Sequence, residues 1–337
     1  EQEYKISINI TPKAFEGLAR QGMLCHQGIC ELCDDALAAA LPGEKARVCV
    51  ALAPDADKNF LQLAVADWGS GMELFALTNA LQLGSSPLSN NRLNEHGYGL
   101  NNALACLSGG TGDWCIYTRD VPGPYFQVHG PFDLEMTVKT TDTIDLPESL
   151  NLQWSEPSTV VYVTVPMTIA RTLQRQGNRK LSDLATLRMW LIEHLGVAYR
   201  GYLELDPVTL EPSAKIAVTV GQSSLLVPPI PVPMILARTE KLEVELSGQI
   251  VPLTYIHGIL DKTKREHLVQ GNKTRYYYQC SQPTQGIDIR LGKRVIATAQ
   301  LGEVWHRDDG SPICRHNSYN DFVGELILPD LPRGIMA

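Results

Sequence analysis

Leu61-Gln-Leu-Ala-Val-Ala-Asp-Trp-Gly-Ser-Gly-Met72 is the stretch of this chain that says most about its fold. Its first half alternates up to Asp67, a pattern typical of a half-buried β-strand that ends at the carboxylate. Gly69 and Gly71 follow, and each can bring the backbone close to a ligand because glycine has no Cβ atom. The stretch therefore predicts a strand that leads into a binding loop.

An acidic helix supplies the second piece of the expected site. Within Glu31-Leu-Cys-Asp-Asp-Ala36, Glu31 and Asp35 are four residues apart, so on a helix they share one face. One carboxylate can then activate a water molecule while the other helps to hold a hard cation, which prefers oxygen ligands. Asp34 is expected to be structural or to support the residues that contact the ligand.

A second glycine pair supplies the third piece. His96-Gly-Tyr-Gly-Leu-Asn101 opens a predicted helix, and the free N–H groups at a helix start form a ready anion site. Phosphates are expected at Gly97 and Gly99, and the carboxylate of Asp67 can accept a hydrogen bond from an adenine amino group. The three pieces together predict a nucleotide site.

These pieces resemble the motifs of the GHKL superfamily of ATPases, which includes gyrase, the heat-shock chaperone, histidine kinases and MutL. The likeness is greatest to the MutL and microrchidia (MORC) branch. Five matches in the family's order cover most of residues 1–165. Residues 31–36 resemble the family's Glu-Leu-x-Asp-Asn-Ala helix, and residues 67–72 resemble its Asp-x-Gly-x-Gly-Met adenine loop. Residues 84–86 resemble the start of its lid, residues 97–100 resemble its phosphate loop, and Ser158-Thr159 resembles the Gly-Thr that closes its adenine pocket.

The resemblance implies ATP and Mg²⁺ as cofactors and gives the residues roles. It implies that Glu31 is the catalytic base that orients the attacking water, that Asp35 is the magnesium ligand, and that Asp67 contacts the adenine. The residues implied to contact the nucleotide are Asp35, Asp67, Gly69, Gly71, Met72, Ser85, Gly97, Tyr98, Gly99, Leu100, Asn101 and Thr159.

Two residues depart from the family pattern. Asp35 stands where the family has the magnesium-binding Asn, which keeps an oxygen ligand but adds a negative charge beside the triphosphate. Asn101 stands where a Lys often follows the second glycine pair, so one phosphate contact is expected to be weaker. The family also has a transducer lysine at the γ-phosphate, for which Lys262, Lys264 and Lys273 are candidates.

The resemblance implies an α/β sandwich of the GHKL (Bergerat) type over residues 1–200, a mixed sheet with helices on one face. A smaller α+β transducer-like domain is expected over residues 201–337, and the prolines at 207–233 favour a boundary near residue 200. The patterns predict helices from Thr11-Pro12 and over 25–41, 73–83, 100–107 and 184–199. They predict strands over 48–53, 60–66, 114–118, 125–128, 159–165, 214–220, 242–246, 250–258, 275–279, 286–290 and 322–328.

Composition bounds the partners and the compartment. The 337 residues carry a formal net charge of -8, which argues against a uniformly basic nucleic-acid-binding surface, although basic stretches occur at 171–180 and 262–265. Eight scattered cysteines and the lack of a long apolar span favour a reducing cytoplasm and no membrane partner. A zinc site of Cys25, Cys30 and Cys33 is disfavoured by its spacing.

In the superfamily, ATP orders a lid and closes a homodimer, so the expected function is a slow Mg-ATPase that acts as a switch or clamp. The segment 84–95 is the expected lid. MORC-like relatives suggest DNA as a further partner, or a role in prokaryotic defence. The alternatives are a histidine kinase, a chaperone-like ATPase and a nucleotide-binding scaffold with little hydrolysis.

Overall fold

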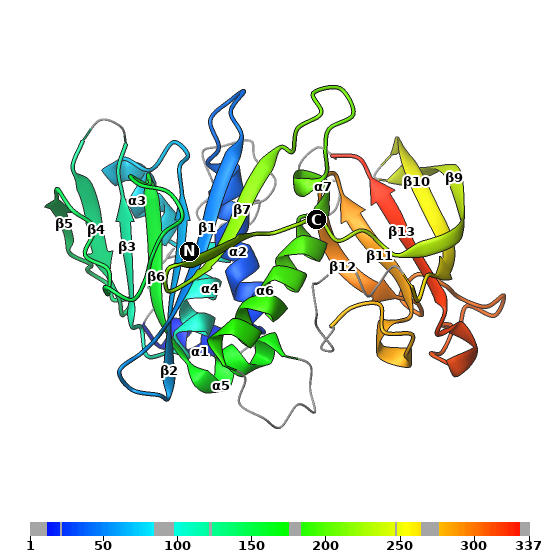
Figure 1. Ribbon diagram of the computed structural model, residues 1–337, viewed down its shortest axis with the longest axis horizontal. Coiled ribbons are helices and arrows are strands. Elements are labelled where there is room, and N and C mark those ends of the chain that lie inside the picture. Colours follow the sequence, from blue (N-terminus) through cyan, green and yellow to red (C-terminus); the bar gives the residue numbers. More distant parts are fainter. Residues whose placement is uncertain are drawn as a thin grey trace, which may run out of the picture. The chain divides into compact units, whose positions relative to one another are not determined.

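The computed structural model describes residues 12–20, 22–83, 98–120, 123–174, 183–246, 248–263 and 276–330. It shows an α/β protein with one eight-stranded and one five-stranded sheet (Figure 1). The chain forms two compact units, a first unit of Glu1–Leu173 with Ile216–Leu225 and a second unit of Gln174–Lys215 with Leu226–Ala337. These units differ from the predicted ranges 1–200 and 201–337 in two segments. Compactness does not test independent folding, so the domain ranges stay a prediction.

The first unit is built on the eight-stranded sheet, whose strand order is β5-β4-β3-β6-β2-β1-β7-β8. Its strands are β1 (Ala46–Pro54), β2 (Phe60–Asp67), β3 (Trp114–Thr118), β4 (Tyr125–His129), β5 (Val138–Thr141), β6 (Thr159–Pro166), β7 (Ala214–Val220) and β8 (Ser223–Leu226). Strands β1 and β2 form an antiparallel hairpin, and β6 pairs antiparallel with both β2 and β3. The predicted strands at 114–118 and 214–220 are confirmed to the residue.

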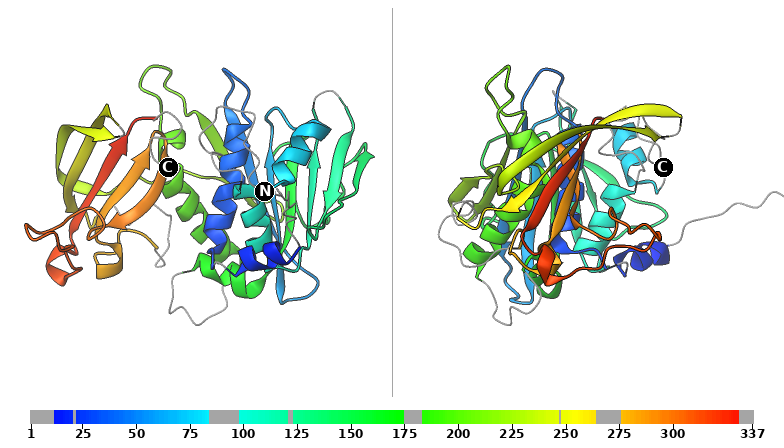
Figure 2. Two further views of the ribbon diagram at one scale, coloured as in Figure 1. Left: turned by 180° about the vertical axis from the view of Figure 1, so that it is seen from behind. Right: turned by 90° about the vertical axis from the view of Figure 1, so that its right-hand side faces the viewer.

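Helices α2 (Cys25–Ala38) and α4 (Gly99–Leu107) pack against one another over one face of this sheet, as the view from behind shows (Figure 2). Close packing is possible because Gly28 faces Leu107: a Cβ atom at Gly28 would lie 2.8 Å from Cγ of that leucine. Helix α2 ends before Pro42-Gly43, as expected. The first unit also contains α3 (Leu74–Leu81), α5 (Met167–Ala170) and α1 (Pro12–Ala19). Helix α1 contacts α4.

The other face of the sheet is closed by the Asp- and Thr-rich segment that follows β5. Small side chains of β1 and β2, such as Ala51 and Ala64, lie on this face together with Tyr117. Leu150 is buried against them, and Trp154 packs beside it. The apolar residues of this segment complete the second half of the core. This explains why both faces of β1 are buried.

The second unit combines α6 (Leu184–Ala198) and α7 (Arg200–Leu203) with a mixed sheet of order β12-β11-β13-β10-β9. Its strands are β9 (Met234–Leu246), β10 (Gln249–Leu260), β11 (Gly286–Leu291), β12 (Arg294–Gln300) and β13 (Phe322–Leu328). Strand β11 runs parallel to β13, and the other pairs with a resolved register are antiparallel. The strand predicted at 322–328 is confirmed as β13. The strand predicted at 242–246 is only the end of β9, and β12 was not predicted.

The predicted strand at 275–279 is wrong over its described part, 276–279. Its aromatic run, Tyr276-Tyr277-Tyr278, is typical of a strand. The backbone N–H groups of Tyr276 and Tyr277 instead donate to the carboxylate of Glu193 on α6, at 3.0 and 3.1 Å. A side chain thus takes the donors that a sheet ladder would use.

A buried charge network joins α7 to the second sheet. The guanidinium of Arg200, only 1% exposed, donates to Glu325 on β13 at 2.8 Å and to Asp288 on β11 at 2.9 Å. Its third nitrogen donates to the hydroxyl of Tyr278, which itself donates to Asp288 at 2.5 Å. Arg290 also lies 3.6 Å from Glu325, whereas Arg200 is the cation that contacts Asp288. Removing Arg200 would leave the Asp288 carboxylate buried without its cation, which is strongly destabilising.

We therefore expect Arg200→Met to lower the stability of the second unit by about 3 to 5 kcal/mol. Native-state hydrogen exchange of the amides in β11 and β13 measures this loss directly. Arg238→Met, on exposed β9, is the matched control and should change exchange little. Unchanged protection in Arg200→Met would contradict a stabilising role for the network.

Candidate functional site

Asp67 ends β2, as predicted, and lies opposite Thr159 of β6 and Val48 of β1. Its side chain is 6% exposed, and one carboxylate oxygen accepts the backbone N–H of Gly69 at 2.9 Å. Burial raises the pKa of Asp67 to about 7, although the Gly69 N–H and the Thr159 hydroxyl favour the ionised form. A ligand that donates to this carboxylate would favour its ionised form further.

The two glycines after Asp67 are required by close approaches within the chain itself. A Cβ atom at Gly69 would lie 2.2 Å from the carbonyl oxygen of Ala39, just beyond α2. At Gly71, which has φ +63°, it would lie 1.8 Å from the carbonyl oxygen of Arg119. These contacts hold the loop between the end of α2 and the end of β3. That both glycines contact the adenine of a bound nucleotide stays a prediction.

Thr118, at the end of β3, links the loop to β6 and was missed by the sequence reading. Its hydroxyl accepts the backbone N–H of Met72 at 2.9 Å and shares a hydrogen bond of 3.1 Å with the hydroxyl of Thr159. Ser158 donates to the carbonyl of Gly69 at 2.7 Å. Thr118 is the last residue of its strand and lies beside Thr159, and this position is the signal that could have identified it. The predicted residues Gly69, Met72 and Thr159 therefore lie in one hydrogen-bonded corner with Asp67.

The carboxylates of α2 face the same site. Burial is the largest cause that raises the pKa of Asp35 well above its usual value, and the charges of Asp34, Glu31 and Asp67 raise it further. Oδ2 of Asp35 is buried and has no hydrogen-bond partner in the described part of the chain. Asp35 on the helix and Asp67 at the strand end therefore lie close enough for their charges to interact. That they form one binding site stays a prediction.

The start of α4 meets this acidic helix. A Cβ atom at Gly99 would lie 2.7 Å from Oε2 of Glu31, so the tip of the Glu31 side chain lies close to the start of α4. Tyr98 precedes the helix and is 51% exposed, and Leu100 is half-buried. Asn101 is fully buried, and neither polar atom of its amide has a hydrogen-bond partner among the described residues. A buried amide in this state is destabilising and calls for a structural or functional explanation.

Several predicted residues lie outside the part of the chain that the structure describes. These are Ser85, Gly97 and all of the expected lid, together with the candidate lysines Lys264 and Lys273. The third candidate, Lys262, pairs with Asp321 at 3.1 Å.

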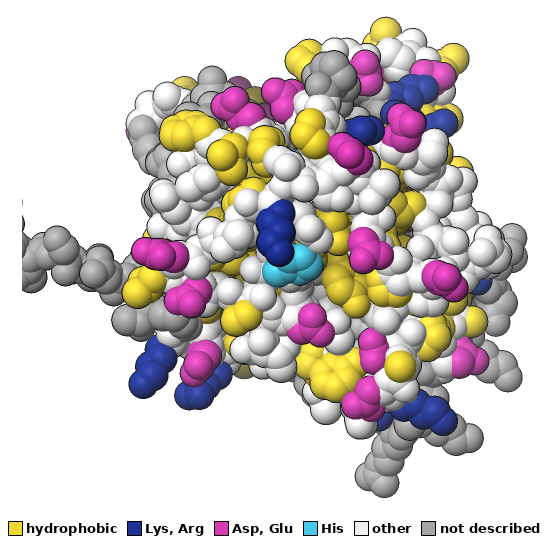
Figure 3. Space-filling model, turned by 90° about the vertical axis from the view of Figure 1, so that its left-hand side faces the viewer, with side chains coloured by type: hydrophobic (Ala, Val, Ile, Leu, Met, Phe, Trp, Pro, Cys, Tyr) yellow, Lys and Arg dark blue, Asp and Glu magenta, His cyan; other side chains and the backbone are white. Residues whose placement is uncertain are grey.

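Other features of the described chain bear on partners. No group of three or more His, Cys, Asp or Glu side chains among the described residues is arranged to hold a metal ion. None of the eight cysteines, all of which lie in the described part of the chain, forms a disulfide. No described helix is long and apolar enough to cross a membrane. On the face of the first unit that carries β4 and β5, acidic side chains are spread widely, and the described basic ones form no continuous patch (Figure 3).

Comparison of the chain with protein-family models gives no match, and no curated protein matches it either. The site is therefore interpreted from its own geometry and from the motifs quoted above.

The pKa of Asp67 gives a test of its burial. An unfolded Asp ionises near pH 4, whereas folded Asp67 keeps its proton to about pH 7, so this group lowers stability as pH rises from 4 to 7. Asp67→Asn removes that penalty. At pH 8 its free energy of unfolding, measured by denaturant titration, should therefore exceed that of the wild type by up to about 4 kcal/mol, and the difference should fade toward pH 4. The control is exposed Asp142→Asn, which should behave as the wild type at both pH values.

Proposed function

We propose that the first unit is an adenine-nucleotide site of the GHKL type and that the protein is a Mg-ATP hydrolase. The observation that carries this proposal is the meeting of three distant stretches: Glu31 of α2 approaches Gly99 of α4, and the strand-end acid Asp67 adds its charge to that of Asp35. Their order and residue types match those of the superfamily. Each stretch alone is weak evidence, but their convergence supports one ligand.

The proposed site has two ends, one for the adenine and one for the phosphates. Asp67, Thr159 and the Gly69 loop form the end suited to an adenine, because a buried carboxylate there can accept from its amino group. The start of α4 forms the phosphate end, since its first N–H groups and the helix dipole favour an anion. Glu31 lies beside that helix start, where it can accept a proton from an attacking water.

The donor set fits a magnesium ion. Oδ2 of Asp35 is a buried carboxylate oxygen without a partner, and the surrounding acids supply the negative charge that a hard cation needs. Mg²⁺ commonly takes one or two protein carboxylates and completes its shell with water and phosphate, so a cluster of three ligands is not required. When bound, the ion would neutralise phosphate charge. Asp35 would hold it, and Glu31 would orient the water.

A nucleotide-binding scaffold with little hydrolysis is the second candidate. One observation favours it: four carboxylates crowd the site, and an ionised Asp35 would repel a triphosphate where the family has a neutral Asn. The two candidates differ in turnover and agree on nucleotide binding. Lid closure, homodimerisation, the DNA link and the defence role come from the resemblance and stay predictions.

Glu31→Gln separates these candidates. In a hydrolase it should lower kcat for Mg-ATP by about 100-fold or more, because the base is lost while binding is kept. Turnover is measured as phosphate release, and binding by calorimetry with ADP. Exposed Glu44→Gln is the control and should retain wild-type turnover.

Equal turnover in Glu31→Gln and the wild type would exclude Glu31 as the base. ADP binding without turnover in any variant would favour the scaffold, and the absence of both would overturn the nucleotide site.

A further inference from the structure

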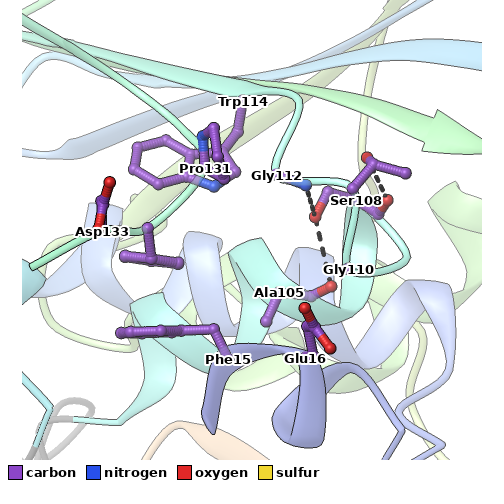
Figure 4. A pocket seen from close by; sticks show the side chains of 11 residues that line it. Phe15, Glu16, Ala105, Ser108, Gly110, Gly112, Trp114, Pro131 and Asp133 are labelled. Carbon is purple, nitrogen blue, oxygen red and sulfur yellow. Dashed lines mark hydrogen bonds between the residues drawn. The ribbon is translucent and has the colours of Figure 1, made fainter. Parts of the chain in front are cut away.

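A separate cavity in the first unit lies at the C-terminal end of α4, away from the Gly99 end. Its volume is about 350 Å³, within the range of small-molecule pockets. Figure 4 shows the side chains around it, with Phe15 of α1 and Trp114 of β3 on opposite sides. It is lined by Phe15, Glu16, Ala105, Ser108, Gly110, Thr111, Gly112, Trp114, Pro131, Phe132 and Asp133.

The inner wall of this cavity is apolar and aromatic. Phe15 stacks on Phe132 with ring centroids 3.9 Å apart, and Trp114 lies 4.7 Å from the same ring. Ala105 and Trp114 are buried at 3% and 2% exposure. The indole N–H does not serve as a donor to the cavity, because its nitrogen is buried against Gly130. A bound molecule therefore meets aromatic carbon here.

The polar groups of the adjoining turn are already used within it. Ser108 is fully buried, and its hydroxyl donates to Ala105 and accepts from the N–H of Gly112, each at 3.3 Å. The N–H of Gly110 donates to the carbonyl oxygen of Ala105 at 2.9 Å, and the Thr111 hydroxyl donates to the backbone carbonyl oxygen of Ser108 at 2.8 Å. This turn offers a ligand few free donors, which disfavours an anion.

Negative charge lies at the mouth. Glu16 and Asp133 are both exposed, and neither forms an ion pair with another described residue. No Lys, Arg or His lines the cavity. The C-terminal end of α4 adds the negative end of a helix dipole, which favours a cation within about one turn.

From the aromatic wall, the two unpaired carboxylates and the helix end, we propose that this cavity binds a small organic cation with an aromatic or aliphatic body. The body would replace water against the half-exposed ring of Phe15, which is favourable for apolar surface, while the buried rings of Phe132 and Trp114 support that wall. The cationic group would lie at the mouth between Glu16 and Asp133. Nothing in this arrangement requires a nucleotide, so the site is independent of the proposed function.

Benzamidinium is a suitable probe, and benzamide is its neutral counterpart of nearly the same shape. Binding is measured by saturation-transfer NMR and titration with the whole chain at low salt. Benzamidinium should bind more tightly than benzamide, and its affinity should fall as salt rises. Glu16→Gln and Asp133→Asn should each weaken it by about fivefold, and the double variant by about 20-fold, while benzamide binding stays unchanged.

Two controls locate the binding. Glu44→Gln removes an exposed charge elsewhere and should leave affinity unchanged. Asp35→Asn tests whether the probe occupies the acidic nucleotide site instead. Loss of binding in Asp35→Asn with full binding in the double variant would overturn the proposal. So would equal affinity for the two probes, or no benzamidinium binding at 10 mM, a concentration on the order of a weak fragment's Kd.

Discussion

The burial of one carboxylate, that of Asp67, is the constraint on which the site in the first unit depends. It lies at the end of a central strand, with a neighbouring strand on each side and α2 over the face. An ionised group there is unfavourable unless donors reach it, which is why its pKa rises to about 7. The Gly69 N–H is one donor, and a ligand's amino group would be another.

The glycines around this carboxylate show how closely the loop is held. Gly69 and Gly71 each lie against a carbonyl of another element, so the loop position is set by the end of α2 and the end of β3. At Gly99 the start of α4 lies close to the tip of the Glu31 side chain. The loop, the end of α2 and the end of β3 are thereby fixed relative to one another before any ligand is bound. Such preorganisation lowers the entropic cost of binding.

Much of the first unit could be predicted from sequence because its signals are local. The alternating run before Asp67, the capped end of α2 and the glycine pair before α4 each mark an element boundary. Thr118 could not be found in this way, since its role depends on the pairing of β3 with β6. The covering segment with Leu150 and Trp154 was missed because its apolar residues follow no regular period. In the second unit, the run of three tyrosines is typical of a strand, but Glu193 accepts the backbone N–H groups of Tyr276 and Tyr277 and no strand forms there.

The central claim is that the Asp67 carboxylate accepts a hydrogen bond from the amino group of an adenine. Calorimetric titration with ADP and with inosine diphosphate at pH 8 tests it most directly, because the inosine base carries a carbonyl oxygen where adenine carries the amino group. The account predicts that ADP binds and that inosine diphosphate binds about 100-fold more weakly or not at all. Equal affinity for the two nucleotides would contradict it.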